Sequence, residues 1–315
     1  MKAIGGFLEL ELNNSGKSFH KMAEPFSTGR ACLNFILKQT RPKIIHIPYY
    51  TCDAIFSSIK KNNIKFKYYS LTEDFKPEGI KLSDGEYVLY INYFGIKADI
   101  IKSLIDKYGS RIIVDNSQGF FEKGYNGIWS FNSARKFFGV PDGAYLYSPF
   151  PVKTRFQRNR MIKYDHLIQR LLGNQEKAYN QFHENEESLN SDLKKISHLS
   201  EFLLDNIDYE QVAKKRLNNF QFLHKRLKKV NQLSISNDTQ GIPLCYPFMP
   251  MKPIDKKTLH KDNLFVPSFW DRSINLHNYG FEFEKKIMCE LLPLPIDQRY
   301  GPNEMISIIE TIRDA

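Results

Sequence analysis

The chain has 315 residues, of which 42% are hydrophobic and 25% charged, and its formal net charge is +10. These values exclude a disordered chain, which lacks the apolar mass needed to offset the entropy of ordering. The length is about twice the ~150 residues of a typical domain and predicts one large or two modest domains. The basic balance favours anionic partners such as nucleic acid or phosphorylated metabolites without choosing among them.

The sequence contains no sign of membrane insertion, export or metal binding. No apolar run reaches the ~18–20 residues of a membrane span, and Glu9 and Glu11 stand where a signal peptide needs an apolar stretch. The four cysteines form no C-x-x-C pair, and the histidines show no H-x-x-x-H spacing. We therefore expect a cytoplasmic protein with no membrane span and no metal site.

The first half of the chain alternates strand-like and helix-like stretches. Apolar, β-branched runs predict strands at 43–48, 66–71, 87–94, 111–115, 128–131 and 143–148. Apolar residues at helical spacing predict helices at 30–39, 51–61 and 97–108. Strands separated by helices imply crossover connections, so we expect an α/β fold with a mostly parallel central sheet flanked by helices. In such a sheet, ligands bind beyond the carboxyl ends of the strands.

The second half changes character. Residues 154–229 are charged and poor in glycine and proline, which predicts helices. The last third predicts strands at 243–250, 264–270 and 290–295 and a closing helix at 303–313. We therefore expect a large α/β domain over residues 1–205 and a smaller α+β domain over residues 206–315.

Two short segments could bind an anion or a cationic ligand. Residues 27–31 form a small-residue turn that opens a helix, where free N–H groups and the helix dipole favour an anion. An ordinary capped helix start is the alternative. Asp115 follows a buried strand directly, which would place its carboxylate at the ligand-binding edge of the sheet, although a turn cap explains it as well.

A third segment contains a lysine with a distinctive setting. Ser133 and Lys136 form S-x-x-K, and Phe137 and Phe138 follow the lysine. An apolar setting favours the free amine that Schiff-base chemistry requires. A solvated surface lysine beside Arg135 is the alternative. S-x-x-K also occurs in serine acylases, but their S-D-N and K-T-G companions are not found in this sequence.

Taken in order, these segments resemble the DegT/StrS family of PLP-dependent sugar aminotransferases, which have the fold-type-I architecture. The S-G-x-x-A-L turn of the family is matched by residues 28–33, its V-H-x-x-G strand end loosely by 91–95, its E-D-x-x-Q segment by 114–118 and its lysine segment by 130–144. The spacing from Lys136 to Asp142 and Gly143 equals that from the lysine to Glu-Gly in the family. This favours Lys136 over Arg135 as the equivalent lysine.

The resemblance implies a role for each matched residue. Lys136 would hold pyridoxal 5'-phosphate (PLP) and carry the proton, and Asp115 would pair with the ring nitrogen. The remaining cofactor contacts would come from Gln118 at the ring hydroxyl, from Gly29 and Arg30 at the phosphate, and from either Ser133, which we favour, or Ser130. Cys52 stands where many family members have an aromatic residue, and Tyr50, Cys52 and Tyr93 are candidates to cover the ring.

The resemblance also implies an activity and a partner. The expected reaction is amino transfer, with glutamate as donor, to a keto-sugar linked to a nucleotide, for surface polysaccharide or another glycoconjugate. The lysine separates this branch from the dehydratases of the family, in which histidine replaces it. Family members form homodimers in which a polar residue of the partner reaches the phosphate, and Ser197 is the candidate for that contact.

Two other interpretations compete with the enzyme. A catalytically degenerate family member acting as a binding or regulatory protein fits the short C-terminal half and Ala144, which replaces the second glycine of the motif. A basic nucleic-acid-binding protein would gather lysines and arginines on one face with interleaved aromatics. The lysines are instead spread along the chain, and no nucleic-acid recognition signature is present, so we expect no nucleic-acid partner.

Overall fold

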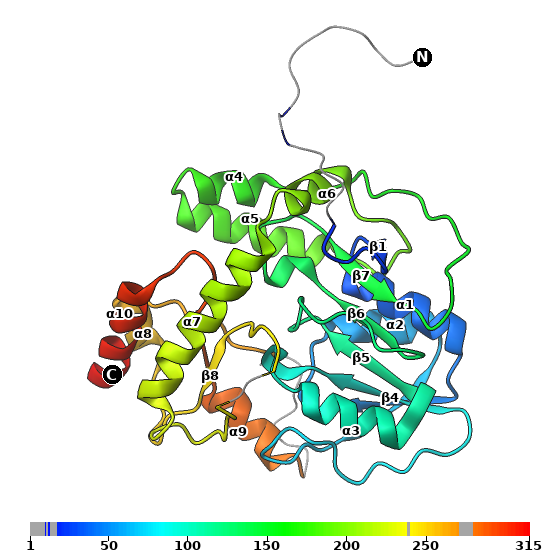
Figure 1. Ribbon diagram of the computed structural model, residues 1–315, viewed down its shortest axis with the longest axis horizontal. Coiled ribbons are helices and arrows are strands. Elements are labelled where there is room, and N and C mark those ends of the chain that lie inside the picture. Colours follow the sequence, from blue (N-terminus) through cyan, green and yellow to red (C-terminus); the bar gives the residue numbers. More distant parts are fainter. Residues whose placement is uncertain (1–9, 11, 13–17, 238–239, 271–279) are drawn as a thin grey trace, which may run out of the picture.

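A computed structural model describes residues 10, 12, 18–237, 240–270 and 280–315. Its centre is a seven-stranded sheet with the order β1-β7-β6-β5-β4-β2-β3, and a separate two-stranded sheet pairs β8 with β9 (Figure 1). The strands are β1 (Glu24–Phe26), β2 (Ile44–Pro48), β3 (Lys65–Tyr69), β4 (Glu86–Ile91), β5 (Ile112–Asn116), β6 (Trp129–Asn132), β7 (Ala144–Tyr147), β8 (Tyr246–Phe248) and β9 (Leu292–Leu294).

Helices connect and cover the strands. They are α1 (Gly29–Thr40), α2 (Ala54–Lys61), α3 (Ala98–Tyr108), α4 (Asp165–Leu171), α5 (Gln175–Ser188), α6 (His198–Asp205), α7 (Tyr209–Leu227), α8 (Lys256–Lys261), α9 (Glu282–Glu290) and α10 (Pro302–Asp314). Three single turns of 3₁₀ helix are η1 (Tyr93–Gly95), η2 (Gly109–Arg111) and η3 (Ala134–Lys136). In the described part of the chain, no helix combines the length and the apolar character needed to cross a membrane.

The large sheet is mostly parallel, which confirms the predicted fold class. Strands β3, β2, β4, β5 and β6 pair in parallel, and only β7 runs against its neighbours β6 and β1. Crossover helices can join parallel strands because they carry the chain back to the start of the sheet. The carboxyl ends of β4, β5 and β6 therefore meet at one edge.

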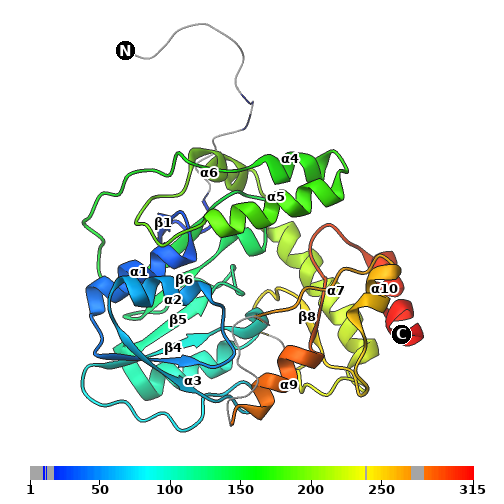
Figure 2. The same ribbon diagram turned by 180° about the vertical axis from the view of Figure 1, so that it is seen from behind.

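The two faces of the sheet pack against different helices. Leu89 and Ile113 join the core beneath α1 and α2, whereas Val88 and Val114 join the core beneath α3. Figures 1 and 2 show α3 on one face of the sheet and α1 with α2 on the other. Side chains alternate along a strand, so Asp115 points to the same face as Ile113, which is the face that α1 covers.

The middle of the chain is helical as predicted, and it contains four helices, α4 to α7. Gly173, at φ +83°, follows α4 in a backbone conformation that favours glycine. Ser197 caps α6 by accepting a hydrogen bond from the N–H of Ser200, and Asp208 caps α7 through the N–H of Gln211. Capping side chains of this kind compete with the helix for backbone hydrogen bonds and divide it.

The last third forms a small core. Side chains from α7, β8, β9 and α10 meet there, among them Phe220, Tyr246, Leu294 and Ile308. Strands β8 and β9 are shorter than predicted, and the strand predicted at 264–270 is wrong, since these residues form no sheet pairing. Burial alternates over residues 264–267 only, and a strand also needs a hydrogen-bonded neighbour. The domain boundary near residue 205 stays a prediction.

Candidate active site

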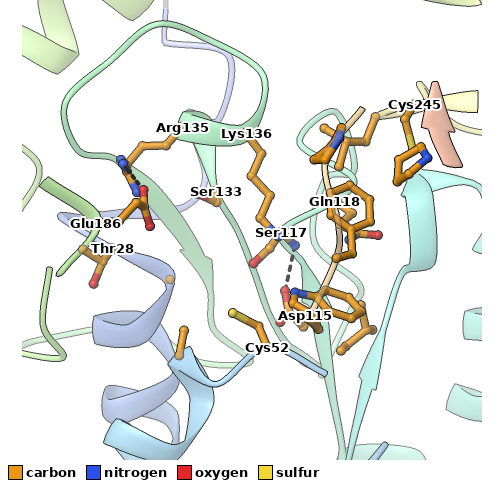
Figure 3. Close-up of a pocket in the computed structure, with 18 of the residues that line it drawn as sticks. Thr28, Cys52, Asp115, Ser117, Gln118, Ser133, Arg135, Lys136, Glu186 and Cys245 are labelled. Atoms are coloured by element: carbon orange, nitrogen blue, oxygen red, sulfur yellow. Dashed lines mark hydrogen bonds and ion pairs between the residues drawn. The ribbon is translucent and has the colours of Figure 1, made fainter. Parts of the chain in front are cut away.

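A cavity of about 620 Å³ opens at the carboxyl ends of β4, β5 and β6, and segments of the last third close its far side. The residues that sequence analysis selected and that line it are Gly29, Arg30, Cys52, Asp115, Gln118, Ser133 and Lys136. They come from four separate segments of the chain, and Figure 3 shows several of them pointing toward one space. Among the described residues, no group of three His, Cys, Asp or Glu side chains could hold a metal ion.

Ser130, the other serine considered for the phosphate, does not line the cavity. It lies on β6 and is fully buried, and its hydroxyl has no hydrogen-bond partner in the described structure. Its neighbour Phe131 lines the cavity, so alternation turns Ser130 toward the opposite face of the sheet. Of the two serines left open by the sequence, only Ser133 therefore faces the cavity.

Helix α1 begins at the cavity wall. The hydroxyl of Thr28 accepts a hydrogen bond from the N–H of Ala31 at 3.0 Å and donates one to the carbonyl of Asn190 at 2.9 Å. The helix start is thus capped, as the simpler interpretation of this turn expected. The cap uses the third N–H of the helix, whereas Gly29 and Arg30 occupy the positions whose N–H groups lack intrahelical partners.

Asp115 ends β5 inside the cavity with 7% of its surface exposed. Its carboxylate accepts a hydrogen bond from the N–H of Ser117 at 2.7 Å. Burial raises the pKa of this carboxyl, and the ammonium of Lys136 and the hydrogen bonds from Ser117 oppose that rise. A buried carboxylate with one cation nearby is suited to receive a cationic or hydrogen-bonding ligand.

The side-chain amide of Gln118 has a hydrogen-bond partner for its oxygen but not for its nitrogen. Its Oε1 accepts a hydrogen bond from the N–H of Phe94 at 2.6 Å, whereas its buried Nε2 has no partner in the described structure. A buried amide without a partner is uncommon and costs free energy. Because Gln118 lines the cavity, this donor is available to an oxygen of a ligand.

Lys136 ends the short η3 turn that follows β6. Figure 3 shows its side chain running into the cavity toward Ser117 and Asp115. The expectation that the flanking phenylalanines enclose the amine is wrong: Phe137 and Phe138 are buried in a separate aromatic cluster, and Lys136 is exposed. The ring that does lie near the amine belongs to Trp270, whose centroid is 5.8 Å from Nζ.

The loop that carries Lys136 is fixed from the last third of the chain. The carbonyl oxygen of Phe137 accepts hydrogen bonds from Nε2 of Gln298 at 2.8 Å and from the guanidinium of Arg216 at 3.5 Å. Arg216 is 1% exposed and also donates to the carbonyls of Pro243 and Leu244. The small core thereby determines where the lysine stands.

A second network holds the far end of the same loop. Asp142 accepts hydrogen bonds from the N–H and hydroxyl of Ser197, from the hydroxyl of Ser200 and from Asn159. Ser197 is buried, so its hydroxyl is used inside this chain and is not free to reach a partner subunit. The expectation for Ser197 is therefore wrong, because the sequence showed a helix cap but not the carboxylate that binds it.

Of the three candidates to cover a ligand ring, only Cys52 lines the cavity. Tyr50 and Tyr93 are fully buried and stack on each other, with ring centroids 5.8 Å apart. The hydroxyl of Tyr93 donates to the carbonyl of Tyr50, which fixes the pair behind the cavity wall.

Sequence reasoning missed several residues that line the cavity. They are Ser117, Arg135, Phe182, Glu186, Cys245, Phe265, Trp270, Asp297 and Arg299. Arg135 forms an ion pair with Glu186, and Arg299 forms two hydrogen bonds to Asp297, at 2.7 and 2.9 Å. Most of these residues lie outside the four segments, and only the acid-basic pairing of 297 with 299 is visible as a local pattern in the sequence.

The arrangement brings complementary groups into one space. An accessible amine can attack a carbonyl, and a buried carboxylate can hold a positive charge opposite it. The start of α1, with Arg30 and with Arg135 from η3, can bind an anion. Such a site suits a ligand with an anionic end and a polar ring.

Comparison with known proteins shows the fold. No protein-family model and no curated protein matches the sequence. Among solved structures, the sugar aminotransferase CalS13 from Micromonospora echinospora is similar with a TM-score of 0.66 and 11% identity, over 95% of this chain and 89% of that one.

Two further structures are similar to the same extent. A DegT DnrJ EryC1 StrS aminotransferase from Brucella abortus has a TM-score of 0.66 and 14% identity, over 93% of this chain and 85% of that one. The PLP form of Spr1654 from Streptococcus pneumoniae has a TM-score of 0.67 and 13% identity, over 95% and 88%. This chain therefore has the fold of these aminotransferases, as the order of its four segments predicted.

Proposed function

We propose that this protein is a PLP-dependent aminotransferase that acts on a keto-sugar. The observation that carries the proposal is the convergence of Lys136, Asp115 and the unpartnered amide of Gln118 on one cavity. Asp115 lies near the end of β5, Gln118 in the turn that follows β5, and Lys136 in the η3 turn that follows β6, so the fold brings all three to the same edge of the sheet. The fold shared with the sugar aminotransferases above supports the same activity.

The side chains present fit PLP. The buried Nε2 of Gln118 offers a hydrogen bond to an oxygen on the ring. Burial raises the pKa of Asp115, and a protonated ring nitrogen would be the cation that offsets this cost. Gly29, Arg30 and Ser133 line the end where α1 begins and would hold the phosphate. A volume of about 620 Å³ lies within the range of small-molecule sites.

Each residue then has a chemical task. PLP, when bound, supplies an electron sink that makes a carbon bearing an amino group acidic. Lys136 would attach the cofactor through Nζ, and the same amine, once released by the amino group of the substrate, would carry a proton between the substrate carbon and the cofactor carbon. Asp115 would keep the ring nitrogen protonated through its negative charge. Trp270, whose ring lies near Nζ, would exclude water from one side of the amine.

The proposal extends to the substrate and the assembly. We infer that glutamate donates the amino group, that the sugar is linked to a nucleotide, and that the product enters a surface polysaccharide or other glycoconjugate. Arg299 places a guanidinium at the cavity, and the net charge of +10 favours the capture of a diphosphate. A cytoplasmic homodimer completes the proposal, following the resemblance of the four segments.

The first test is an absorbance titration of the purified protein with PLP. We expect a new cofactor band in the wild type and in Lys163→Ala, a change at an exposed lysine away from the cavity, but not in Lys136→Ala. Addition of glutamate should then shift the band as the amino group is transferred. If the wild type gives no band at any PLP concentration, the enzyme proposal fails, and a catalytically degenerate binding protein becomes the better interpretation.

A further inference from the structure

Three charged side chains gather at one end of the cavity. Glu186, in the last turn of α5, forms an ion pair with Arg135, and its Oε2 lies 4.0 Å from a guanidinium nitrogen of Arg30. Figure 3 shows Arg135 and Glu186 facing each other on the side of the cavity where Thr28 lies, away from Gln118. The carboxylate therefore lies at the end where α1 begins, which is where an anionic ligand would bind.

Arg135 does not depend on Glu186 for its position. Its Nε donates a hydrogen bond to the carbonyl of Pro141 at 3.0 Å, within the loop that carries Lys136. Its side chain is 12% exposed, so its charge is largely desolvated. Without the glutamate, the guanidinium would keep its place and lack an anion, which is a costly state for a buried charge.

Glu186 lies on a helix with few buried anchors. Among the residues of α5, only Ala178 and Asn185 are buried, and most of the others are polar and solvated. Burial raises the pKa of Glu186, but the nearby positive charges outweigh burial and lower the pKa. The largest of these contributions comes from Arg135, followed by Arg30 and Lys136. The side chain is therefore a carboxylate at neutral pH, on an element that can shift at small cost.

We propose that Glu186 occupies the anion position between Arg30 and Arg135 and competes there with a phosphate group, so that it sets the affinity for a phosphorylated cofactor. The inference rests on the proposed function, since the phosphate meant is that of PLP. A phosphate monoester carries about −1.5 to −2 charges at neutral pH, against one for the carboxylate, and can therefore displace it from the two guanidinium groups.

The test compares PLP with pyridoxal, which lacks the phosphate. Dissociation constants are measured by absorbance titration for the wild type, Glu186→Gln and Glu187→Gln. Glu187 is the exposed next residue of the same helix, so its variant makes the same change of charge without touching the arginines. We expect Glu186→Gln to bind PLP about tenfold more tightly, the effect of removing one competing charge at close range. Pyridoxal binding should be unchanged, and Glu187→Gln should match the wild type.

Several results would overturn the inference. Weaker or unchanged PLP binding in Glu186→Gln would mean that the carboxylate positions the arginines or has no effect, and an equal gain for pyridoxal would remove the phosphate from the explanation. Glu186→Ala should also bind PLP more tightly than the wild type. This second variant checks that the effect comes from the loss of the carboxylate and not from the glutamine that replaces it.

Failure of the proposed function gives a different result. If no variant forms a cofactor band that depends on Lys136, the competition is tested with inorganic phosphate as the probe. The measured quantity is the rise in the melting temperature of the protein that phosphate causes. A larger rise in Glu186→Gln than in the wild type supports the competing carboxylate even then. Equal rises overturn it.

Discussion

The guanidinium carbon of Arg216 lies 4.5 Å from the centroid of the Phe137 ring, and the same guanidinium donates a hydrogen bond to the Phe137 carbonyl. Phe137 follows Lys136 directly, so a residue of α7 fixes the backbone beside the proposed catalytic amine. Burial lowers the pKa of Arg216 to about 10, which leaves it charged at neutral pH. Its hydrogen bonds to three carbonyls and to Gln298 are what make this buried charge tolerable.

Arg216→Met should therefore loosen the lysine loop as well as the small core. We expect the free energy of unfolding to fall by about 2–4 kcal/mol, since several buried carbonyls lose their donor. PLP affinity should fall too, because the position of Lys136 is no longer fixed. Urea unfolding and the absorbance titration measure the two effects. Lys214→Met, at an exposed position of the same helix, is the control and should change neither.

Asp115→Asn should separate binding from catalysis. Asparagine preserves the shape and the hydrogen bond from Ser117 but removes the charge that keeps a ring nitrogen protonated. We expect the PLP band to persist while the rate of amino transfer falls by about a hundredfold or more. Asp106→Asn, at an exposed position of α3, should retain full turnover. Undiminished turnover in Asp115→Asn would remove this carboxylate from the mechanism.

Replacement of Gly95 by any residue with a side chain should destabilise the protein. Its φ is +74°, and a Cβ there would lie 2.4 Å from the carbonyl oxygen of Gln118. Gly95→Ala should lower the free energy of unfolding by more than the ~1 kcal/mol that a left-handed backbone alone costs, and should weaken PLP binding by displacing Gln118. Gly79→Ala is the matched control, because its φ is +69° and nothing lies within 4 Å of its Cβ. Equal losses in the two variants would show that the close contact is relieved elsewhere.

The stability of the protein should fall in mild acid because of His20. Burial lowers the pKa of this histidine to about 3, and its ring bonds Tyr147 and Asn132. Its folded pKa lies below the unfolded value of 6.5, so its contribution is complete above about pH 6.5 and is lost progressively as the pH falls toward 3. Urea unfolding between pH 7 and pH 4 should show a steeper loss for the wild type than for His20→Gln. Parallel curves would mean that other groups cause the loss.

Much of the large sheet could be predicted from the sequence because its central strands, β2, β4, β5 and β6, are buried on both faces. Such strands appear in the sequence as continuous apolar runs, and in the segments between them the apolar residues recur at helical spacing. Strand β1 was not predicted, because its three residues, Glu24–Phe26, are too few to show an apolar run or an alternating pattern. The segment 264–270 was wrongly predicted to be a strand, because a short apolar segment does not by itself provide a neighbouring strand to pair with.

The candidate site could be predicted only where its residues follow strands. Asp115, Gln118 and Lys136 lie in local motifs, so order and spacing were enough to select them. Glu186 and Arg216 contact residues of the same loop from 51 and 79 residues away in the sequence, and no local pattern connects them to it. The exposure of Lys136 agrees with the alternative of a solvated lysine beside Arg135, since adjacent phenylalanines in a sequence do not have to point the same way as the residue they flank.

The strand order also has a consequence for synthesis on the ribosome. Every strand of the seven-stranded sheet lies between residues 24 and 147, so all of its hydrogen-bonded partners have emerged before the second half of the chain is made. The contacts that fix the turn after Lys136 come from Arg216 and Gln298, which emerge much later. A nascent chain can thus form its large sheet while the amine of Lys136 is still loosely held, and under the proposed function the cofactor would bind after the last third of the chain has folded.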